Sequence, residues 1–283
     1  MSNFARYNPL PALRHLAMAA SLSLTLAASS VMALERIVVA DGALTEILYA
    51  LGEESRIQGV DTTSTYPESA SALPNVGYLR QLSAEGILSL QPDLLLTTQD
   101  AGPPAVLQQL RDAGVRVEQL QVDYSLQGTL ALVRQVGQLI DQSEASEQLA
   151  QQIEQQVQAV AGQLADLPML FVLNAGNRGL LASGTDTRAH ALMQLVGGRN
   201  VFADFSGYKP MTNEAVLLAA PQVVLVSHAD GDLSLLAQHP ALSLTPAAQQ
   251  GRLYSADHRD WLVFGPRLAD AVAELTALIQ ADL

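Results

Sequence analysis

One loop–helix–strand unit occurs twice in the chain, and this repeat constrains the fold more than any other feature. The first copy covers residues 77–96 and the second covers residues 207–225. Each copy has a hydroxyl residue that can cap a helix, a glutamate in the first helical turn, and a proline seven residues after the glutamate: Ser83, Glu85 and Pro92, then Thr212, Glu214 and Pro221. A buried strand is expected after each proline. Two such units predict two α/β lobes that face each other across a ligand-binding cleft.

Strands and helices alternate through the rest of the chain, which is typical of parallel α/β architecture. In the first half we predict strands at 36–40, 57–60, 94–97 and 116–120, and helices at 45–51, 83–90 and 103–113. In the second half we predict strands at 170–173 and 223–226, and helices at 188–196, 214–220 and from Pro266 to the C-terminus.

The two halves are separated by one long amphipathic segment. Its apolar residues recur at spacings of three and four: Leu149, Ile153, Val157, Val160 and Leu164. This spacing places them on one face of a helix. The predicted fold is therefore two Rossmann-like lobes, residues 34–142 and 167–283, joined by one long α-helix at residues 143–166.

The first 33 residues have the pattern of a secretory signal peptide. Arg6 and Arg14 precede an apolar stretch at residues 16–28, and Val31-Met32-Ala33 offers small residues for cleavage before Leu34. The alternative is an uncleaved membrane anchor, but the stretch is short for a span. We therefore expect the signal to be cleaved near Ala33 and the mature protein to be exported.

The charge and residue content exclude several function classes. The presequence carries two of the 15 basic residues and no acidic one, so the mature chain has 13 basic against 28 acidic residues, a net charge of −15. Such a surface argues against nucleic acid as a partner. The absence of cysteine excludes disulfides and thiolate sites. The chain lacks a Gly-x-Ser-x-Gly elbow, a phosphate-binding loop and a His-Glu-x-x-His motif, so we do not expect an enzyme.

Residues 76–90 resemble the segment that marks haem receptors among the class III periplasmic binding proteins, whose relatives serve cobalamin and siderophore importers. The resemblance rests on Tyr78-x-Arg80, followed by Glu85, an apolar helix and Pro-Asp, and it extends over nearly all of the mature chain. Residues 207–210 are similar to the second-lobe loop of these receptors. The resemblance implies a monomeric periplasmic receptor that binds one ferric haem b in the cleft and delivers it to an inner-membrane ABC permease and its ATPase.

The resemblance also implies roles for individual residues. Tyr78 would be the axial ligand of the haem iron, and Arg80 its hydrogen-bonding neighbour. Glu85 and Glu214, one per lobe, would dock onto basic residues of the permease. From the residues alone, an alternative to docking is as well supported: both glutamates stabilise the starts of their helices and do nothing more.

The chemistry of Tyr78 fits this role. A phenolate is a hard anionic ligand suited to ferric iron, and tyrosine ligation of haem is an established mode. In an extended loop, residues two apart face the same side, so we expect the Arg80 guanidinium to donate to the phenolate oxygen. The competing interpretation is that Tyr78 is a loop residue that packs against a neighbouring helix.

The second lobe offers further pocket candidates. We expect Tyr208 and Lys209, the only lysine of the chain, to face the cleft. Tyr208 would stack on the porphyrin or form a hydrogen bond, and Lys209 would pair with a propionate. Arg178 is another propionate candidate. Residues 174–177 include no histidine, which favours one haem with a single protein ligand. His190 and His228 remain as possible distal ligands.

Two other functions are compatible with the sequence. One is a receptor for cobalamin or a ferric siderophore, although siderophore sites usually have several arginines and this chain has few basic residues. The other is a secreted α/β enzyme that uses a metal or a carboxylate pair in the cleft.

Overall fold

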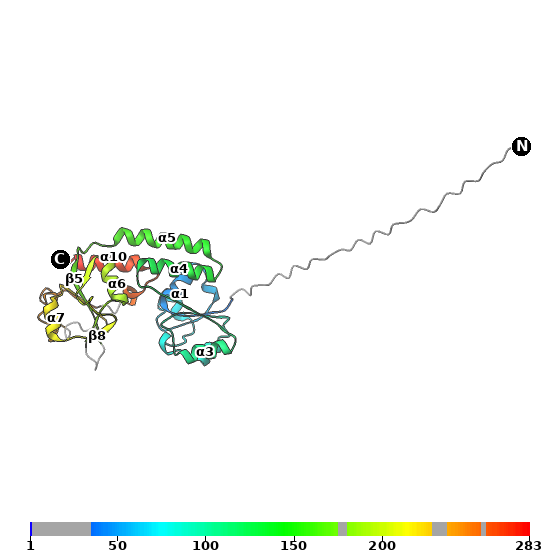
Figure 1. Ribbon diagram of the computed structural model, residues 1–283, viewed down its shortest axis with the longest axis horizontal. Helices are drawn as coiled ribbons and strands as arrows, with labels where there is room; N and C mark the ends of the chain where they lie inside the picture. Colours follow the sequence, from blue (N-terminus) through cyan, green and yellow to red (C-terminus); the bar gives the residue numbers. More distant parts are fainter. Residues whose placement is uncertain (2–34, 175–179, 228–236, 256–258) are drawn as a thin grey trace. The chain divides into compact units, whose positions relative to one another are not determined.

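Two β-sheets, each built from its own half of the chain, organise the protein (Figure 1). The computed structural model describes residues 1, 35–174, 180–227, 237–255 and 259–283. The first sheet has the strand order β2-β1-β3-β4 and all of its pairs are parallel. Its strands are β1 (Ile37–Ala40), β2 (Ile57–Val60), β3 (Leu94–Thr98) and β4 (Arg116–Leu120). These strands lie where the alternating pattern predicts them.

The helices of the first half are α1 (Gly42–Ala50), α2 (Ala84–Leu88) and α3 (Pro104–Asp112), with the 3-10 turns η1 (Glu54–Arg56), η2 (Glu68–Ala72) and η3 (Leu79–Gln81). Of these helices, α2 begins at its predicted capping residue, Ser83, whereas α1 begins three residues before the expected start at residue 45. The Asp41 carboxylate accepts a hydrogen bond from the Ala43 amide at 2.8 Å and so caps α1. Ser83 caps α2 in the same way, at 3.4 Å from the Gly86 amide. β1 and β3 are buried along their whole length, because helices and loops cover both faces of a parallel sheet.

The second sheet is mixed, with the order β10-β9-β5-β6-β8 and with β7 paired to β5. Its strands are β5 (Leu167–Asn174), β6 (Leu180–Ser183), β7 (Gly198–Asn200), β8 (Tyr208–Pro210), β9 (Val223–Ser227) and β10 (Leu253–Ser255). β6 is antiparallel to both β5 and β8. The helices in this half of the chain are α6 (Arg188–Leu195), α7 (Asn213–Ala219) and α9 (Pro246–Gln249). We call the first sheet with α1–α3 the first lobe, and the second sheet with α6, α7 and α9 the second lobe.

The connecting helix is shorter than predicted. α5 (Ser143–Val160) ends six residues before the expected boundary at residue 166. The reason is the backbone that follows it, because Gly162, Ala165 and Asp166 all have positive φ values, which cannot continue a right-handed helix. A further helix, α4 (Leu126–Leu139), packs along α5 and is not predicted, since Gly128 and Gly137 interrupt its run of helix formers.

A continuous apolar core joins the two lobes beneath α4, α5 and the C-terminal helix α10 (Leu268–Gln280), which lie along one side of both sheets (Figure 1). The 3-10 turn η5 (Arg259–Leu262) leads into α10. The core includes Leu44 of α1, Phe171 of β5 and Trp261, so it is not divided at the lobe boundary. Among the described helices, none has the length and apolar character required to cross a membrane.

Candidate functional site

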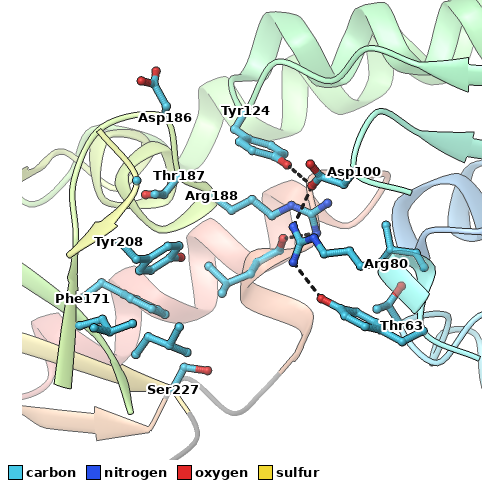
Figure 2. Close-up of a pocket in the computed structure, with 16 residues that line it drawn as sticks. Thr63, Arg80, Asp100, Tyr124, Phe171, Asp186, Thr187, Arg188, Tyr208 and Ser227 are labelled. Atoms are coloured by element: carbon cyan, nitrogen blue, oxygen red, sulfur yellow. Dashed lines mark hydrogen bonds and ion pairs between the residues drawn. The ribbon is translucent and has the colours of Figure 1, made fainter. Parts of the chain in front are cut away.

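A pocket of about 720 Å³ lies between the lobes (Figure 2). This volume falls in the range of roughly 300–1,000 Å³ that is typical of small-molecule sites. The first lobe provides a polar wall, and the second lobe provides an apolar wall next to a few polar residues, among them Asp186 and Arg188. The polar wall contains Tyr78, Arg80, Asp100 and Tyr124, and the apolar wall contains Phe171, Leu173, Leu181 and Tyr208.

The polar wall is built from loops at the carboxyl ends of parallel strands. Asp100 follows β3 and Tyr124 follows β4, and the carboxyl ends of these strands lie at one edge of the sheet. Tyr78 stands in extended backbone immediately before η3. Gly77 precedes it with a φ of +94°, a conformation that glycine adopts without strain, and this turn directs the chain into the pocket.

Arg80 lies between Tyr78 and Asp100. One guanidinium nitrogen, Nη1, donates to the Tyr78 hydroxyl oxygen at 2.8 Å, and Nη2 donates to Asp100 Oδ2 at 3.0 Å. The backbone at Arg80 is a 3-10 turn and not the expected extended loop. The contact forms all the same, because the long arginine side chain reaches back over the Tyr78 ring, with Cζ 5.9 Å from the ring centroid.

The same carboxylate has a second partner. The Tyr124 hydroxyl donates to Asp100 Oδ2 at 3.1 Å, and burial of the Tyr124 phenol raises its pKa. Tyr124 therefore remains a neutral donor at physiological pH. Figure 2 shows Arg80, Asp100 and Tyr124 as one hydrogen-bonded group on the first-lobe side of the pocket.

Arg188, at the start of α6, extends from the second lobe across to the first. Its Nη2 donates to the buried Asp41 carboxylate at 3.2 Å, and its guanidinium lies 5.0 Å from the Tyr124 ring centroid. This residue lines the pocket and is not among the predicted site residues. The sequence could have indicated Arg188 as a site residue. A positive charge in the first turn of a helix is unfavourable next to the helix dipole, so an arginine there suggests a role other than stabilising the helix.

Asp100 and Tyr124 were also missed. Both lie in the loops that follow predicted strands, at 94–97 and 116–120, so the rule that ligands bind at the carboxyl ends of strands would have pointed to these loops. Nothing in their local sequence distinguishes them from other loop residues.

Tyr208 lies in the pocket, but Lys209 does not line it. Tyr208 contacts Phe171 edge-on, with ring centroids 6.4 Å apart, and burial raises the pKa of the Tyr208 phenol. The expectation that Lys209 faces the same cleft is wrong, because residues 208–210 form a strand, in which successive side chains point to opposite faces. The Lys209 ammonium instead lies 4.9 Å from the Phe205 ring centroid.

The remaining predicted residues have different positions. Arg178 and His228 lie outside the described residues. His190 lines a neighbouring hollow of about 650 Å³, and its Nδ1 lies 3.2 Å from the Asn200 side-chain amide. Burial lowers the pKa of His190, so the ring is neutral at physiological pH.

Glu85 and Glu214 occupy equivalent places in the two lobes. Each is exposed in the first turn of its helix, one position after the first helical residue of α2 and of α7. In the described part of the chain, neither carboxylate forms a hydrogen bond or an ion pair with another side chain. The equivalence of the two repeats in sequence therefore extends to their local structure.

The described residues contain no group of three or more histidine, aspartate and glutamate side chains able to hold a free metal ion. A metal already held by a flat organic ligand needs only one or two axial protein ligands. Tyr78 offers one oxygen for that purpose, and the apolar wall opposite offers a surface for the ligand's face.

Comparison with known proteins gives a consistent set of matches. Residues 37–259 match the family described as periplasmic binding protein. The chain is 31% identical over 211 residues to the vitamin B12-binding protein of Yersinia pestis (strain Pestoides F), covering 74% of this chain and 75% of that protein. The apo periplasmic heme-binding protein RhuT from Roseiflexus sp. RS-1 superposes with a TM-score of 0.82 at 36% identity, covering 88% and 98% of the two chains. The periplasmic heme-binding protein BhuT in complex with two hemes superposes with a TM-score of 0.80 at 39% identity, and the match covers 87% of this chain and 98% of that chain.

Proposed function

The chain belongs to the periplasmic binding protein family, and we propose that it binds one ferric haem in the inter-lobe pocket through Tyr78 and delivers it to an ABC permease. The observation that carries this proposal is the Tyr78 hydroxyl, which faces the pocket and accepts a hydrogen bond from Arg80 at 2.8 Å. The haem-binding relatives with the same fold support the choice of ligand.

In this proposal the Tyr78 oxygen loses its proton and ligates the ferric iron. The Arg80 guanidinium then donates to an anionic oxygen, and such charge-assisted hydrogen bonds are stronger than neutral ones. The same hydrogen bond withdraws electron density from the oxygen and weakens the Fe–O bond. A weaker bond favours release of haem to the permease.

The two pocket walls suit the two parts of haem. Phe171, Leu173 and Leu181 form an apolar surface for a porphyrin face. We propose Arg188 for the propionates, in place of Lys209. An arginine has five N–H donors. The described hydrogen bonds of Arg188 go to Asp41, to the Leu262 carbonyl oxygen and to the Tyr124 hydroxyl, so not all five donors are used.

Spectroscopy tests the ligand assignment. Purified protein titrated with ferric haem should saturate at one haem per chain and show the high-spin spectrum of a tyrosinate ligand. Tyr78→Phe should lose that spectrum, because phenylalanine has no oxygen to donate. Tyr208→Phe should keep it, and Tyr66→Phe is the matched control, since Tyr66 is an exposed tyrosine that does not line the pocket. An unchanged spectrum in Tyr78→Phe would rule out the assignment.

Cobalamin is the second candidate, because the chain is 31% identical to a vitamin B12-binding protein. A cobalamin site has no need of a phenolate held by an arginine. Titration of the same preparation with cyanocobalamin decides between the two, and saturation by cobalamin with no response to haem would favour this alternative. A ferric siderophore fits less well, since siderophore sites usually have several arginines and, among the described residues, Arg80 and Arg188 are the two arginines that line the pocket.

Delivery is proposed to depend on Glu85 and Glu214. Their exposed, equivalent positions fit two basic sites on the permease. Replacing both with alanine should leave haem affinity unchanged and impair uptake in a reconstituted importer that contains the permease and its ATPase. Glu144→Ala is the matched control, because Glu144 is an exposed glutamate in the first turn of α5. Full transport by the double variant would contradict this role.

We further propose that the protein acts as a monomer in the periplasm after removal of residues 1–33, and that it has no catalytic role. Mass spectrometry of the exported protein tests the cleavage site before Leu34.

A further inference from the structure

The Arg80 side chain depends on its partners for its position. Just over half of its surface, 56%, is exposed to solvent. In the part of the chain that the structure describes, its guanidinium donates hydrogen bonds only to Tyr78 and Asp100. A long, exposed arginine has many rotamers, so a single hydrogen bond to Tyr78 would not hold it.

Asp100, by contrast, is held firmly. The loop that carries it is tied to the turn that carries Arg80 by two backbone hydrogen bonds, from the Gly102 amide to the Leu79 carbonyl oxygen and from the Leu82 amide to the Gly102 carbonyl oxygen, both 2.9 Å. The Asp100 carboxylate also accepts a hydrogen bond from Tyr124. Asp100 therefore has a fixed position relative to the backbone of Arg80.

The neighbouring residue fixes the third loop. The Gln99 side-chain amide bonds both backbone groups of Val122, accepting from its amide at 2.8 Å and donating to its carbonyl oxygen at 3.2 Å. This double contact mimics one more step of strand pairing beyond the end of β3 and β4. The loop with Tyr124 is thereby attached to the loop with Asp100.

We infer that Asp100 is a positioning residue for the haem-iron site, which holds the Arg80 guanidinium against the Tyr78 oxygen. The inference rests on the proposed function. The Arg80 guanidinium donates through Nη1 to the Tyr78 phenol and through Nη2 to the Asp100 carboxylate. Figure 2 shows Arg80 beside Asp100. Without the Asp100 carboxylate, Arg80 loses the hydrogen bond that holds Nη2, and its side chain turns into solvent. Loss of Asp100 is then equivalent to loss of Arg80.

A double-mutant cycle tests this equivalence. Arg80→Ala should lower haem affinity by roughly tenfold to a hundredfold, the usual effect of removing a partner of a metal ligand. The lost stabilisation of the Tyr78 phenolate outweighs the gain from a stronger Fe–O bond, and the tyrosinate-to-iron charge-transfer band should shift. Asp100→Ala should give nearly the same loss and the same band shift. The double variant should lose no more than either single variant, because both act through one contact. Asp100→Asn should fall between wild type and Asp100→Ala, since the amide oxygen still accepts from Arg80 without a charge.

Glu118→Ala is the matched control. Glu118 pairs with Arg116 at 2.7 Å in the same lobe, and neither residue lines the pocket. This variant should bind haem like wild type. Additive losses in the Asp100→Ala and Arg80→Ala double variant, or a band in Asp100→Ala at the wild-type wavelength, would overturn the inference.

A measurement on the empty protein separates this inference from the proposed function. The Arg80 Nε–H signal in an NMR spectrum, assigned by its absence in Arg80→Ala, should be sharp in wild type and broadened in Asp100→Ala. Failure of the proposed function appears as a wild-type protein that does not bind haem. Failure of the inference appears as an unchanged Arg80 signal in Asp100→Ala, whatever the ligand.

Discussion

Replacing Arg188 with methionine should destabilise the protein by about 3 kcal/mol. The change removes the guanidinium, which lies 3.2 Å from an Asp41 carboxylate that is only 2% exposed. Removing one partner of a buried ion pair costs about 3–5 kcal/mol, because it leaves an uncompensated charge. Here Arg188 is 30% exposed and Asp41 keeps its hydrogen bond to the Ala43 amide, so we expect about 2–3 kcal/mol from the ion pair. Loss of the contact with the Tyr124 ring adds about 0.5–1 kcal/mol.

Methionine keeps the apolar stem of the side chain, so the lost stability measures removal of the charge and not the opening of a cavity. Urea unfolding followed by circular dichroism at neutral pH measures the change, and the melting temperature should fall by roughly 6–12 °C for a protein of this size. Arg199→Met is the matched control. The Arg199–Asp166 pair has the same separation, 3.2 Å, but its side chains are 51% and 76% exposed. It should cost less than about 1 kcal/mol. Equal losses in the two variants would refute the reasoning from burial.

Three further predictions concern packing, capping and pH. Gly137→Ala should lower the free energy of unfolding in urea by about 2 kcal/mol, because the added methyl group would overlap the Ser146 side chain where α4 meets α5. Gly86→Ala is the control and should be neutral or slightly stabilising, since the nearest atom to its added methyl group lies at an ordinary 3.7 Å. Thr187→Ala should cost about 1–2 kcal/mol by the same assay, because the buried hydroxyl accepts from the His190 amide at 3.1 Å and caps α6. Burial raises the pKa of Asp61 above 3.8, so its contribution to stability is complete below pH 3.8 and is lost as the pH rises through the folded-state pKa. Asp61→Asn should therefore gain stability relative to wild type as the pH rises above 3.8, and an opposite trend would contradict the assigned cause.

The repeated unit is the part of the fold that local sequence predicts best. Ser83 and Thr212 both cap their helices as expected, because capping depends on residues a few positions apart. β7, β8 and β10 are not predicted, since a strand of three residues is too short to show a period. The end of α5 was placed too late because the apolar residue Leu164 continues the helical spacing after the backbone has left the helix.

Within the candidate site, local spacing brings Tyr78 and Arg80 together, and the structure places them in contact. Lys209 shows the limit of this reasoning, because whether it faces the pocket depends on strand pairing between β6 and β8 and not on its neighbours. The contact between Arg188 and Asp41 joins residues 147 positions apart. No local pattern encodes such a pair, and only the topology of the two sheets brings it together.

The acidic residues of α1 have a consequence for the order in which the chain folds. Asp41 and Glu46 are buried near the start of the folded domain, yet their arginine partners are Arg188 and Arg267, the latter 221 residues after Glu46. During synthesis the first helix therefore cannot acquire its ion partners until almost the whole polypeptide has left the ribosome. Contacts this distant in sequence slow folding. A helix near the beginning of the folded domain that is completed by residues near its end ties completion of the first lobe to synthesis of the last helix.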